Sequence, residues 1–180
     1  MSLWQYCWRV ILLLLTLFAA SNAPQVLLRA LAASPAKPAL DVKLTAENAQ
    51  PRQLEDTTEN AIVRDYSAAW KSLESSLAQN RDDQLAANFT GGALDQLKSR
   101  LEGQQKNGLR TRLIDRGHKL EAVFYSPEGS AMQLRDTAQL EIQVLDGGQV
   151  IHSEQATLHY IALMTTAEDR WKVRLLEEVQ

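Results

Sequence analysis

The sequence contains one cysteine, Cys7, among 180 residues. A single cysteine excludes an internal disulfide and a cysteine-based metal cluster in this chain. An excess of basic residues is also missing, since 19 Lys and Arg face 22 Asp and Glu, which gives a net charge of −3. This balance argues against a surface that attracts nucleic-acid backbones. The hydrophobic fraction of 45% and the charged fraction of 23% are typical of a globular protein. We therefore expect one domain of ordinary size.

The N-terminal region carries an apolar run, Val10–Ala20, without a charged residue. The run is short for a membrane span and is followed by small residues, as in a secretory signal. We predict that residues 1–23 are either a cleaved signal peptide or an uncleaved membrane anchor. Pro24 would hinder cleavage, and Trp4 and Trp8 suit the headgroup layer of a retained anchor. Both alternatives predict an exported protein, whether periplasmic, secreted or membrane-anchored with its domain outside the cytoplasm.

Residues 24–55 are predicted to form a linker. Pro35 and Pro38 interrupt a segment rich in Ala, Lys, Pro and Gln that has no sustained hydrophobic period. The folded domain is then expected to span residues 56–180. We find no internal repeat in it.

Two helices are expected at the start of this domain. Asp56 and Glu59 have the spacing of a capping box, and a long amphipathic helix is predicted over residues 57–79. A short helical piece over residues 84–89 precedes a second helix, for which Gly108 is a plausible C-cap. The inward face of the long helix has apolar residues at helical spacing: Ile62, Tyr66, Ala69, Trp70, Leu73 and Leu77.

The second half of the domain has the alternating pattern of strands joined by short turns. Helices followed by four or five antiparallel strands predict an α+β fold, with the helices packed on one face of a curved, cone-shaped sheet. The expected strands cover residues 110–114, 118–125, 131–145, 150–165 and 170–179.

The turn at residues 126–130 sets the register of the first hairpin. If Ser126 faces Ser130, Phe124 lies opposite Met132 and Leu120 lies opposite Asp136. The second hairpin has two possible registers. A two-residue loop at Gly147-Gly148 places His159 opposite Asp136, and a three-residue loop places Leu158 there, which fits the pattern of the faces better.

A long helix with Tyr66 and Trp70, shorter helices, and long hairpins ending in Asp169-Arg170-Trp171-Lys172-Val173 resemble the nuclear-transport-factor-2-like superfamily. Within it, the turn at residues 126–130 is similar to membrane-tethered, non-catalytic branches. Examples are the inner-membrane-space-type domain of plastid and cyanobacterial division proteins and the anchored accessory proteins of mycobacterial lipid import. The resemblance covers roughly residues 57–179 and implies a cystatin-like cone.

Asp136 is the principal candidate for a catalytic residue, because it is the one ionisable group on an otherwise apolar strand face. Enzymes of the resembled superfamily keep a general base on the concave face of the sheet, where desolvation raises the pKa of a carboxyl group. Tyr160 or His159 would assist it. The structural alternative is that Asp136 caps a helix end or pairs with a basic residue such as Arg112 or Arg116.

Six residues are expected to line the space between helix and sheet, either as packing or as the wall of a ligand pocket. No pair of histidines has the spacing of metal ligands, so we predict neither a metal nor a cofactor. The predicted ligand-binding residues are Tyr66, Trp70, Phe124, Asp136, Tyr160 and Trp171.

These patterns favour a non-enzymatic accessory domain of the cell envelope that binds a protein partner through the curved sheet or the cone mouth. The alternative is a small-ligand pocket, or an isomerase- or dehydratase-like enzyme with Asp136 as its general base. The partners expected are an envelope protein and, through the N-terminal segment if it is uncleaved, the membrane. A homodimer formed through the sheet is compatible with both, and no nucleic acid is expected.

Overall fold

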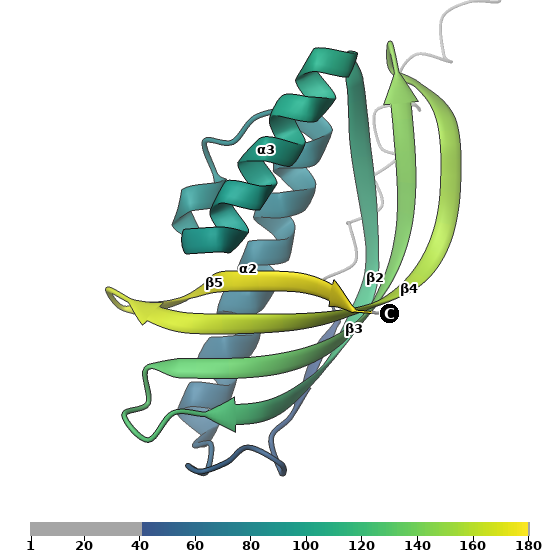
Figure 1. The fold of residues 1–180 in the computed structure, drawn as a ribbon. Helices are drawn as coiled ribbons and strands as arrows, with labels where there is room; N and C mark the ends of the chain where they lie inside the picture. The colour runs from purple at the N-terminus through teal and green to yellow at the C-terminus, as the bar shows by residue number, and fades with distance from the viewer. Residues whose placement is uncertain (1–40, 180) are drawn as a thin grey trace, which may run out of the picture. The chain divides into compact units, whose positions relative to one another are not determined.

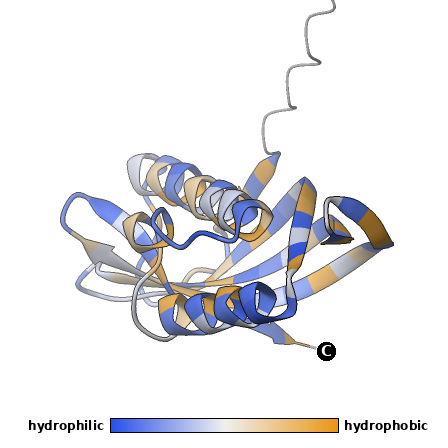
Figure 2. Ribbon diagram, turned by 90° about the horizontal axis from the view of Figure 1, so that it is seen from above, coloured by the Kyte–Doolittle hydropathy of each residue, from blue (hydrophilic) through white to orange (hydrophobic). Residues whose placement is uncertain are grey.

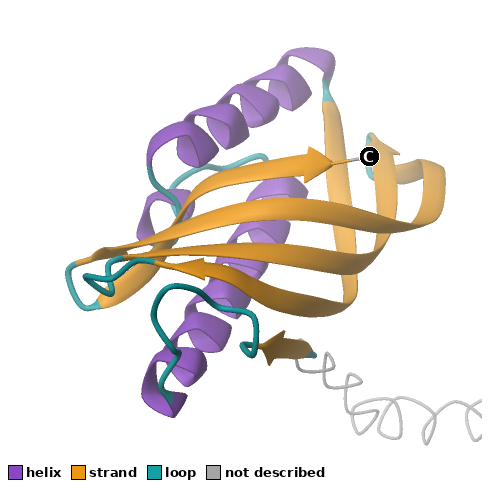
Figure 3. Cartoon of the chain, turned by 60° about the horizontal axis from the view of Figure 1, so that its bottom comes forward, coloured by secondary structure: helices purple, strands orange, loops and turns teal. Residues whose placement is uncertain are grey.

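A five-stranded sheet carries two helices on one of its faces (Figure 1; Figure 3). The computed structural model describes residues 41–179, which belong to one compact unit. The strands follow one another in the order β1-β2-β3-β4-β5, and the sheet is not closed. The predicted α+β fold is confirmed. The elements are β1 (Val42–Thr45), α2 (Asp56–Gln79), η2 (Leu85–Ala87), α3 (Gly91–Asn107), β2 (Leu109–Tyr125), β3 (Ala131–Asp146), β4 (Gln149–Ala167) and β5 (Arg170–Val179).

The predicted signal peptide or anchor, residues 1–23, lies outside the described residues. Within residues 41–179, no helix has the length and apolar character that a membrane crossing requires.

Helix α2 forms where its apolar period predicts it, beginning one residue earlier than expected. Glu55 occupies the N-cap position without a side-chain hydrogen bond to the backbone, so the predicted capping box is not formed. The predicted C-cap of α3 is confirmed, with Gly108 in the left-handed conformation at φ 68°. The apolar face of α2 is buried against the sheet and comprises Ile62, Tyr66, Ala69, Trp70, Leu73 and Leu77.

The folded part begins earlier than residue 56, where the sequence places its start. Residues 42–45 form β1, which pairs in parallel with residues 118–121 of β2. The sheet is therefore mixed, whereas a wholly antiparallel one was expected. The segment after β1 continues beside β2, since the N–H of Tyr125 donates to the carbonyl of Gln50. The predicted linker covers residues 24–55, and its C-terminal part thus belongs to the folded domain.

Strand β2 is continuous where two separate strands were predicted. The expected interruption at residues 115–117 is a β-bulge, across which the pairing with β3 shifts by one residue. Gly117 lies in this bulge with φ 143°, a conformation that residues with a side chain rarely adopt. The hydropathy of the strands alternates in bands along their length (Figure 2).

The first hairpin has the predicted register only away from its turn. Leu120 lies opposite Asp136 as expected, but a second bulge, between Ala122 and Phe124, moves Tyr125 opposite Met132. Tyr125 is consequently 3% exposed, and Phe124 is 39% exposed. The prediction that Phe124 lines the core is therefore wrong, because one extra residue reverses which side chains face inward.

Neither predicted register of the second hairpin is observed. Asp146 pairs with Gln149 around a two-residue loop, but a bulge between Val144 and Leu145 shifts the remaining pairs by one. Tyr160 therefore lies opposite Asp136, and His159 lies opposite Thr137.

Candidate functional site: a buried acid–imidazolium cluster

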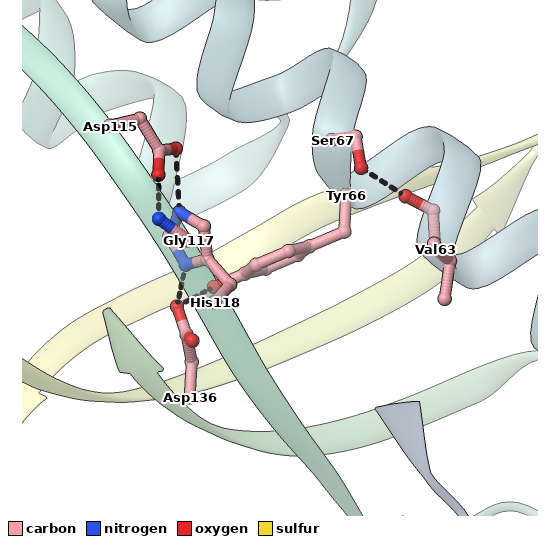
Figure 4. Close-up of polar contacts among 7 residues, drawn as sticks. All are labelled: Val63, Tyr66, Ser67, Asp115, Gly117, His118 and Asp136. Carbon is pink, nitrogen blue, oxygen red and sulfur yellow. Dashed lines mark hydrogen bonds and ion pairs between the residues drawn. The ribbon is translucent and has the colours of Figure 1, made fainter. Parts of the chain in front are cut away.

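Asp136 lies on the helix-facing side of β3, and its side chain has no exposed surface. Its Oδ2 atom accepts a hydrogen bond of 2.7 Å from the hydroxyl of Tyr66 on α2 and lies 2.7 Å from Nδ1 of His118 on β2. Figure 4 shows these side chains converging on one carboxylate oxygen. The other oxygen, Oδ1, is buried without a hydrogen-bond partner among the described residues. Asp136 pairs with a basic residue, as the structural alternative expects, but that residue is His118 and not Arg112 or Arg116.

His118 is held between two carboxylates. Its Nε2 atom lies 2.8 Å from Oδ2 of Asp115, and Nδ1 contacts Asp136. Carboxylate oxygens accept hydrogen bonds, so a ring protonated on both nitrogens, an imidazolium, can donate to both of these acids. Burial lowers the pKa of His118, but the hydrogen bonds and negative charges of Asp115 and Asp136 outweigh burial and raise it to about 9.

The bulge at Gly117 positions Asp115 for this contact. The N–H of Gly117 donates a hydrogen bond of 2.8 Å to Oδ1 of Asp115. The other carboxylate oxygen is thereby directed at His118, three residues along the same strand. Without the extra residue of the bulge, Asp115 and His118 would lie on opposite faces of the strand.

Aromatic rings enclose the imidazolium. The ring of Trp70 lies 4.5 Å from that of His118, and the ring of Tyr66 meets His118 edge-on at 5.8 Å. A cation within about 6 Å of an indole ring is attracted by the ring quadrupole. Burial and the charge of Asp136 raise the pKa of Tyr66 well above its usual value, so the hydroxyl remains a donor. We call Tyr66, Asp115, His118 and Asp136 the acid–imidazolium cluster.

A general base must reach a substrate proton directly or through one water molecule. The side chains of His118 and Asp136 are 0% exposed, and that of Asp115 is 4% exposed. Oδ2 of Asp136 is already engaged by two protein groups, and Oδ1 is buried. The cluster therefore joins α2, β2 and β3, and its titratable side chains are enclosed by the fold.

A cleft of about 250 Å³ opens between α2, α3 and the sheet, and we call it the inner cleft. Trp70 and Tyr160 form part of its wall, and their rings lie 5.5 Å apart. Burial and the charge of Glu178 raise the pKa of Tyr160 to about 12, although Arg100 opposes this change. Because Trp70 also covers His118, it stands between the inner cleft and the cluster. The remaining wall is mostly apolar and includes Leu73, Leu97, Leu113, Leu140, Ile142, Leu158 and Leu176.

The opposite face of the sheet has a hollow of about 650 Å³, which we call the outer hollow. Its wall includes charged and polar side chains beside apolar ones: Arg135 lies 3.6 Å from Glu121, and Thr137 contacts His159 at 3.2 Å. Lys119 adds a further charge. Asp136 contributes to the wall of this hollow only with atoms outside its fully buried side chain.

The structure thus separates the six residues expected to form one pocket. Trp70 and Tyr160 line the inner cleft, and Tyr66 and Asp136 belong to the buried cluster. Trp171 is 7% exposed and packs 6.3 Å from Tyr125. Its backbone N–H donates to the buried carboxylate of Asp65, a second acid that the sequence reading missed. Phe124 lies on the surface, and His159 faces the outer hollow and not Asp136.

The sequence reading also missed Asp115 and His118. The signal for His118 was present: with Leu120 opposite Asp136, His118 lies two residues away on the same face, within diagonal reach of the carboxylate. Among residues 41–179, no group of three or more His, Cys, Asp and Glu side chains is arranged to hold a metal ion.

Comparison with known proteins identifies solved structures with a similar fold. No protein-family model matches the sequence, and no curated protein is significantly similar to it. Among solved structures, the intermembrane space region of the chloroplast protein ARC6 superposes with a TM-score of 0.61. The two are 16% identical, and the match covers 72% of this chain and 98% of that one. The described residues share the α+β fold of that region.

A weaker likeness connects the chain with a cystatin-like protein of unknown function from Nostoc punctiforme. Its TM-score is 0.41 at 10% identity, over 71% of this chain and 93% of the other. At these identities neither likeness extends to a function.

Proposed function

We propose that this chain is a non-enzymatic binding domain of the cell envelope, exported or membrane-tethered, that engages a protein partner through the outer face of its curved sheet. The observation that carries the proposal is the enclosure of Asp136. The residue best suited by sequence to act as a general base has a fully buried side chain, and its Oδ2 atom is engaged by His118 and Tyr66.

The outer hollow supplies a surface suited to such a partner. It combines charges of both signs, from Lys119, Glu121 and Arg135, with the neutral polar groups of Thr137 and His159. Mixed charges of this kind fix the orientation of a partner and select against wrong ones. The extracytoplasmic location rests on the apolar run at residues 10–20 and is in keeping with the likeness to an intermembrane-space domain.

Site-specific photo-crosslinking in the native envelope tests this proposal. A photoreactive amino acid at Thr137, in the outer hollow, should give one discrete adduct. The same amino acid at Lys71, on the exposed side of α2, should give none. Reversing the charge of Arg135 (Arg135→Glu) should abolish the adduct at Thr137. Equal adducts from both positions, or none from Thr137, would count against partner binding at this face.

The inner cleft supports a second candidate, a small-ligand site. Its apolar wall, with Arg100 and Glu178 at the edge, suits a small amphiphilic molecule, and its volume is slightly below the usual range for ligand pockets, about 300–1,000 Å³. Trp70 in the wall provides a direct readout. Its fluorescence should change on titration with a lipid extract of the envelope, and a Leu158→Trp variant, which fills the cleft, should lose the response.

A further inference from the structure

The tip of the β3–β4 hairpin carries two neighbouring exposed aliphatic side chains. Val150 and Ile151 are 47% and 60% exposed, and only two other large apolar side chains of residues 41–179 are exposed. Ile151 is the extra residue of the bulge in β4 and has no partner on β3. Strand β5 pairs with β4 only from His159 onward, so the tip extends beyond β5 (Figure 3). Exposed apolar side chains that lie together mark a surface for contact with a protein or a membrane.

Two arginines of β2 lie beside this tip on the outer face of the sheet. Arg110 and Arg112 are exposed, and Thr111 between them is buried, so the arginines point away from the helices. Leu145 of β3 lies opposite both Arg110 and Val150. Residues opposite each other share a face of the sheet, so the arginines and Val150 lie on the same side. We call Arg110, Arg112, Val150 and Ile151 the hairpin tip patch.

The positive charge of the hairpin tip patch is not cancelled by neighbouring acids. Neither of its arginines forms an ion pair within residues 41–179. Glu141 also faces outward, but it is bonded to Arg116 at 2.8 Å. By strand alternation, Asp146 and Glu154 lie on the helix-facing side of the hairpin. The outer side of the tip therefore combines exposed aliphatic groups with uncompensated cations.

The N-terminal end of the folded domain is directed toward this patch. Strand β1 runs parallel to β2, with Val42 opposite His118, so the chain enters β1 from the side of β2 that leads to Arg110. At about 3.3 Å per residue, His118 and Arg110 are about 25 Å apart along the strand. The predicted linker residues that precede the described part, 24–40, can span up to about 60 Å. A membrane that holds residues 1–23 is therefore within reach of the patch.

The two kinds of side chain in the patch match the two layers of a membrane surface. Near an anionic surface, each arginine contributes about fivefold in affinity through its attraction to the headgroups. Exposed aliphatic side chains enter the boundary between the headgroups and the acyl chains. A flexible tether raises the local concentration of the domain to about the millimolar range, so contacts of this modest strength are sufficient to orient it.

We propose that the hairpin tip patch docks the domain on a membrane surface that contains anionic lipids. Arg110 and Arg112 contact the headgroups, and Val150 and Ile151 enter the acyl boundary. The inference rests on the membrane-tethered form of the proposed function. It does not use the outer hollow, whose β2 residues lie beyond the bulge at Gly117.

Dye fluorescence of the full-length chain in vesicles tests this docking. In a Cys7→Ser background, an environment-sensitive dye on Ile151→Cys should brighten and shift to the blue in vesicles of phosphatidylcholine and phosphatidylglycerol. It should not do so in vesicles of phosphatidylcholine alone. Salt at 1 M, which shortens the Debye length to about 3 Å, should remove the response. The matched control is Thr166→Cys, an exposed position at the other end of the same strand, which should not respond.

Charge variants test the role of the arginines. Arg110→Gln combined with Arg112→Gln should lower the ratio of docked to undocked domain about 25-fold and remove the dye response. Arg170→Gln combined with Arg174→Gln makes the same change of charge at exposed positions of β5 and should retain the response. Equal effects of the two pairs would contradict a specific docking surface.

A dye response that is the same in both kinds of vesicle, or absent from both, would overturn the inference. A response to polyglutamate but not to the charged vesicles would also overturn it, because the arginines would then serve an acidic protein. Flotation with phosphatidylcholine vesicles tests separately whether residues 1–23 hold the chain in a membrane. Loss of flotation with the dye response retained would contradict the tether and support the docking surface.

Discussion

Nδ1 of His118 lies 2.7 Å from Oδ2 of Asp136, and both side chains are completely buried. This contact joins the first two long strands at the point where α2 crosses them. Its two charges make it sensitive to substitution and to pH.

Replacing Asp136 by Asn should lower the free energy of unfolding by about 3 kcal/mol, because it leaves a buried imidazolium with one carboxylate where it had two. Chemical denaturation measures the change. Asp146→Asn, at the exposed end of the same strand, is the control and should shift stability by less than about 0.5 kcal/mol. If the two variants were equally stable, the cluster would have no role in holding the sheet to α2.

Stability should decrease as the pH rises from about 6.5 to 9. The pKa of His118 is about 9 in the folded protein and 6.5 in its ordinary state, so the folded chain binds more protons in this interval. The contribution is complete below pH 6.5, is lost by pH 9, and is on the order of 3 kcal/mol. Urea unfolding across this range measures it. His118→Gln should flatten the slope, whereas His152→Gln, at an exposed position, should retain it.

The second buried acid predicts a loss of stability in acid. Burial raises the pKa of Asp65, but the Arg64 guanidinium and the N–H of Trp171 outweigh burial and lower the pKa below its usual range. A depressed pKa stabilises the fold above pH 4, and this contribution is lost as the pH falls through the folded value. Asp65→Asn should reduce the acid sensitivity below pH 4 in thermal unfolding experiments. An unchanged acid transition would contradict this assignment.

Two glycine substitutions should act in opposite directions. Gly117→Ala should cost about 1–3 kcal/mol, because φ is 143° and a Cβ there would lie 3.2 Å from the carbonyl oxygen of Asp41. Gly103→Ala, inside α3 with no neighbour within 4 Å, should stabilise the protein by about 0.5–1 kcal/mol. Melting temperatures compare them directly. A stabilising Gly117→Ala would mean that the bulge is not required.

The bulge before the first turn can be tested with adjacent residues. Tyr125→Ala should cost about 3–5 kcal/mol, because Tyr125 packs on Trp171 and under the Arg52 guanidinium, 5.2 Å from the ring centre. Phe124→Ala should cost less than about 1 kcal/mol, since Phe124 is substantially exposed. A larger loss of stability for Phe124→Ala than for Tyr125→Ala would indicate that the bulge is absent and that Phe124 faces the core.

The sequence allowed the layers of this fold to be predicted, because helical spacing in α2 and strand alternation in β2–β5 are strong periodic signals. The bulges could not be predicted. Each adds one residue to one strand at little local cost, and only the packing of Tyr125 or the Asp115–His118 contact determines where it occurs. The sequence therefore identified Asp136 as unusual and correctly placed Leu120 opposite it. It did not reveal that His118 contacts Asp136.

Strand β1 was missed for a different reason. Its four residues are too few to show a period, and a parallel partner 76 positions along the chain, His118 for Val42, leaves no turn signal between them. Only the folded structure brings the two strands together.

The parallel pairing of β1 with β2 also determines how the domain would bear a mechanical load. A pull on the chain from the N-terminal side of residue 41 acts along β1 and loads its hydrogen bonds to β2 in shear. The bond from the N–H of His118 to the carbonyl of Asp41 lies at the end where the pull is applied. Bonds loaded together resist more force than bonds opened one after another. The strand that receives this tension also carries His118, so the load passes from β1 to the strand that the buried cluster joins to α2 and β3.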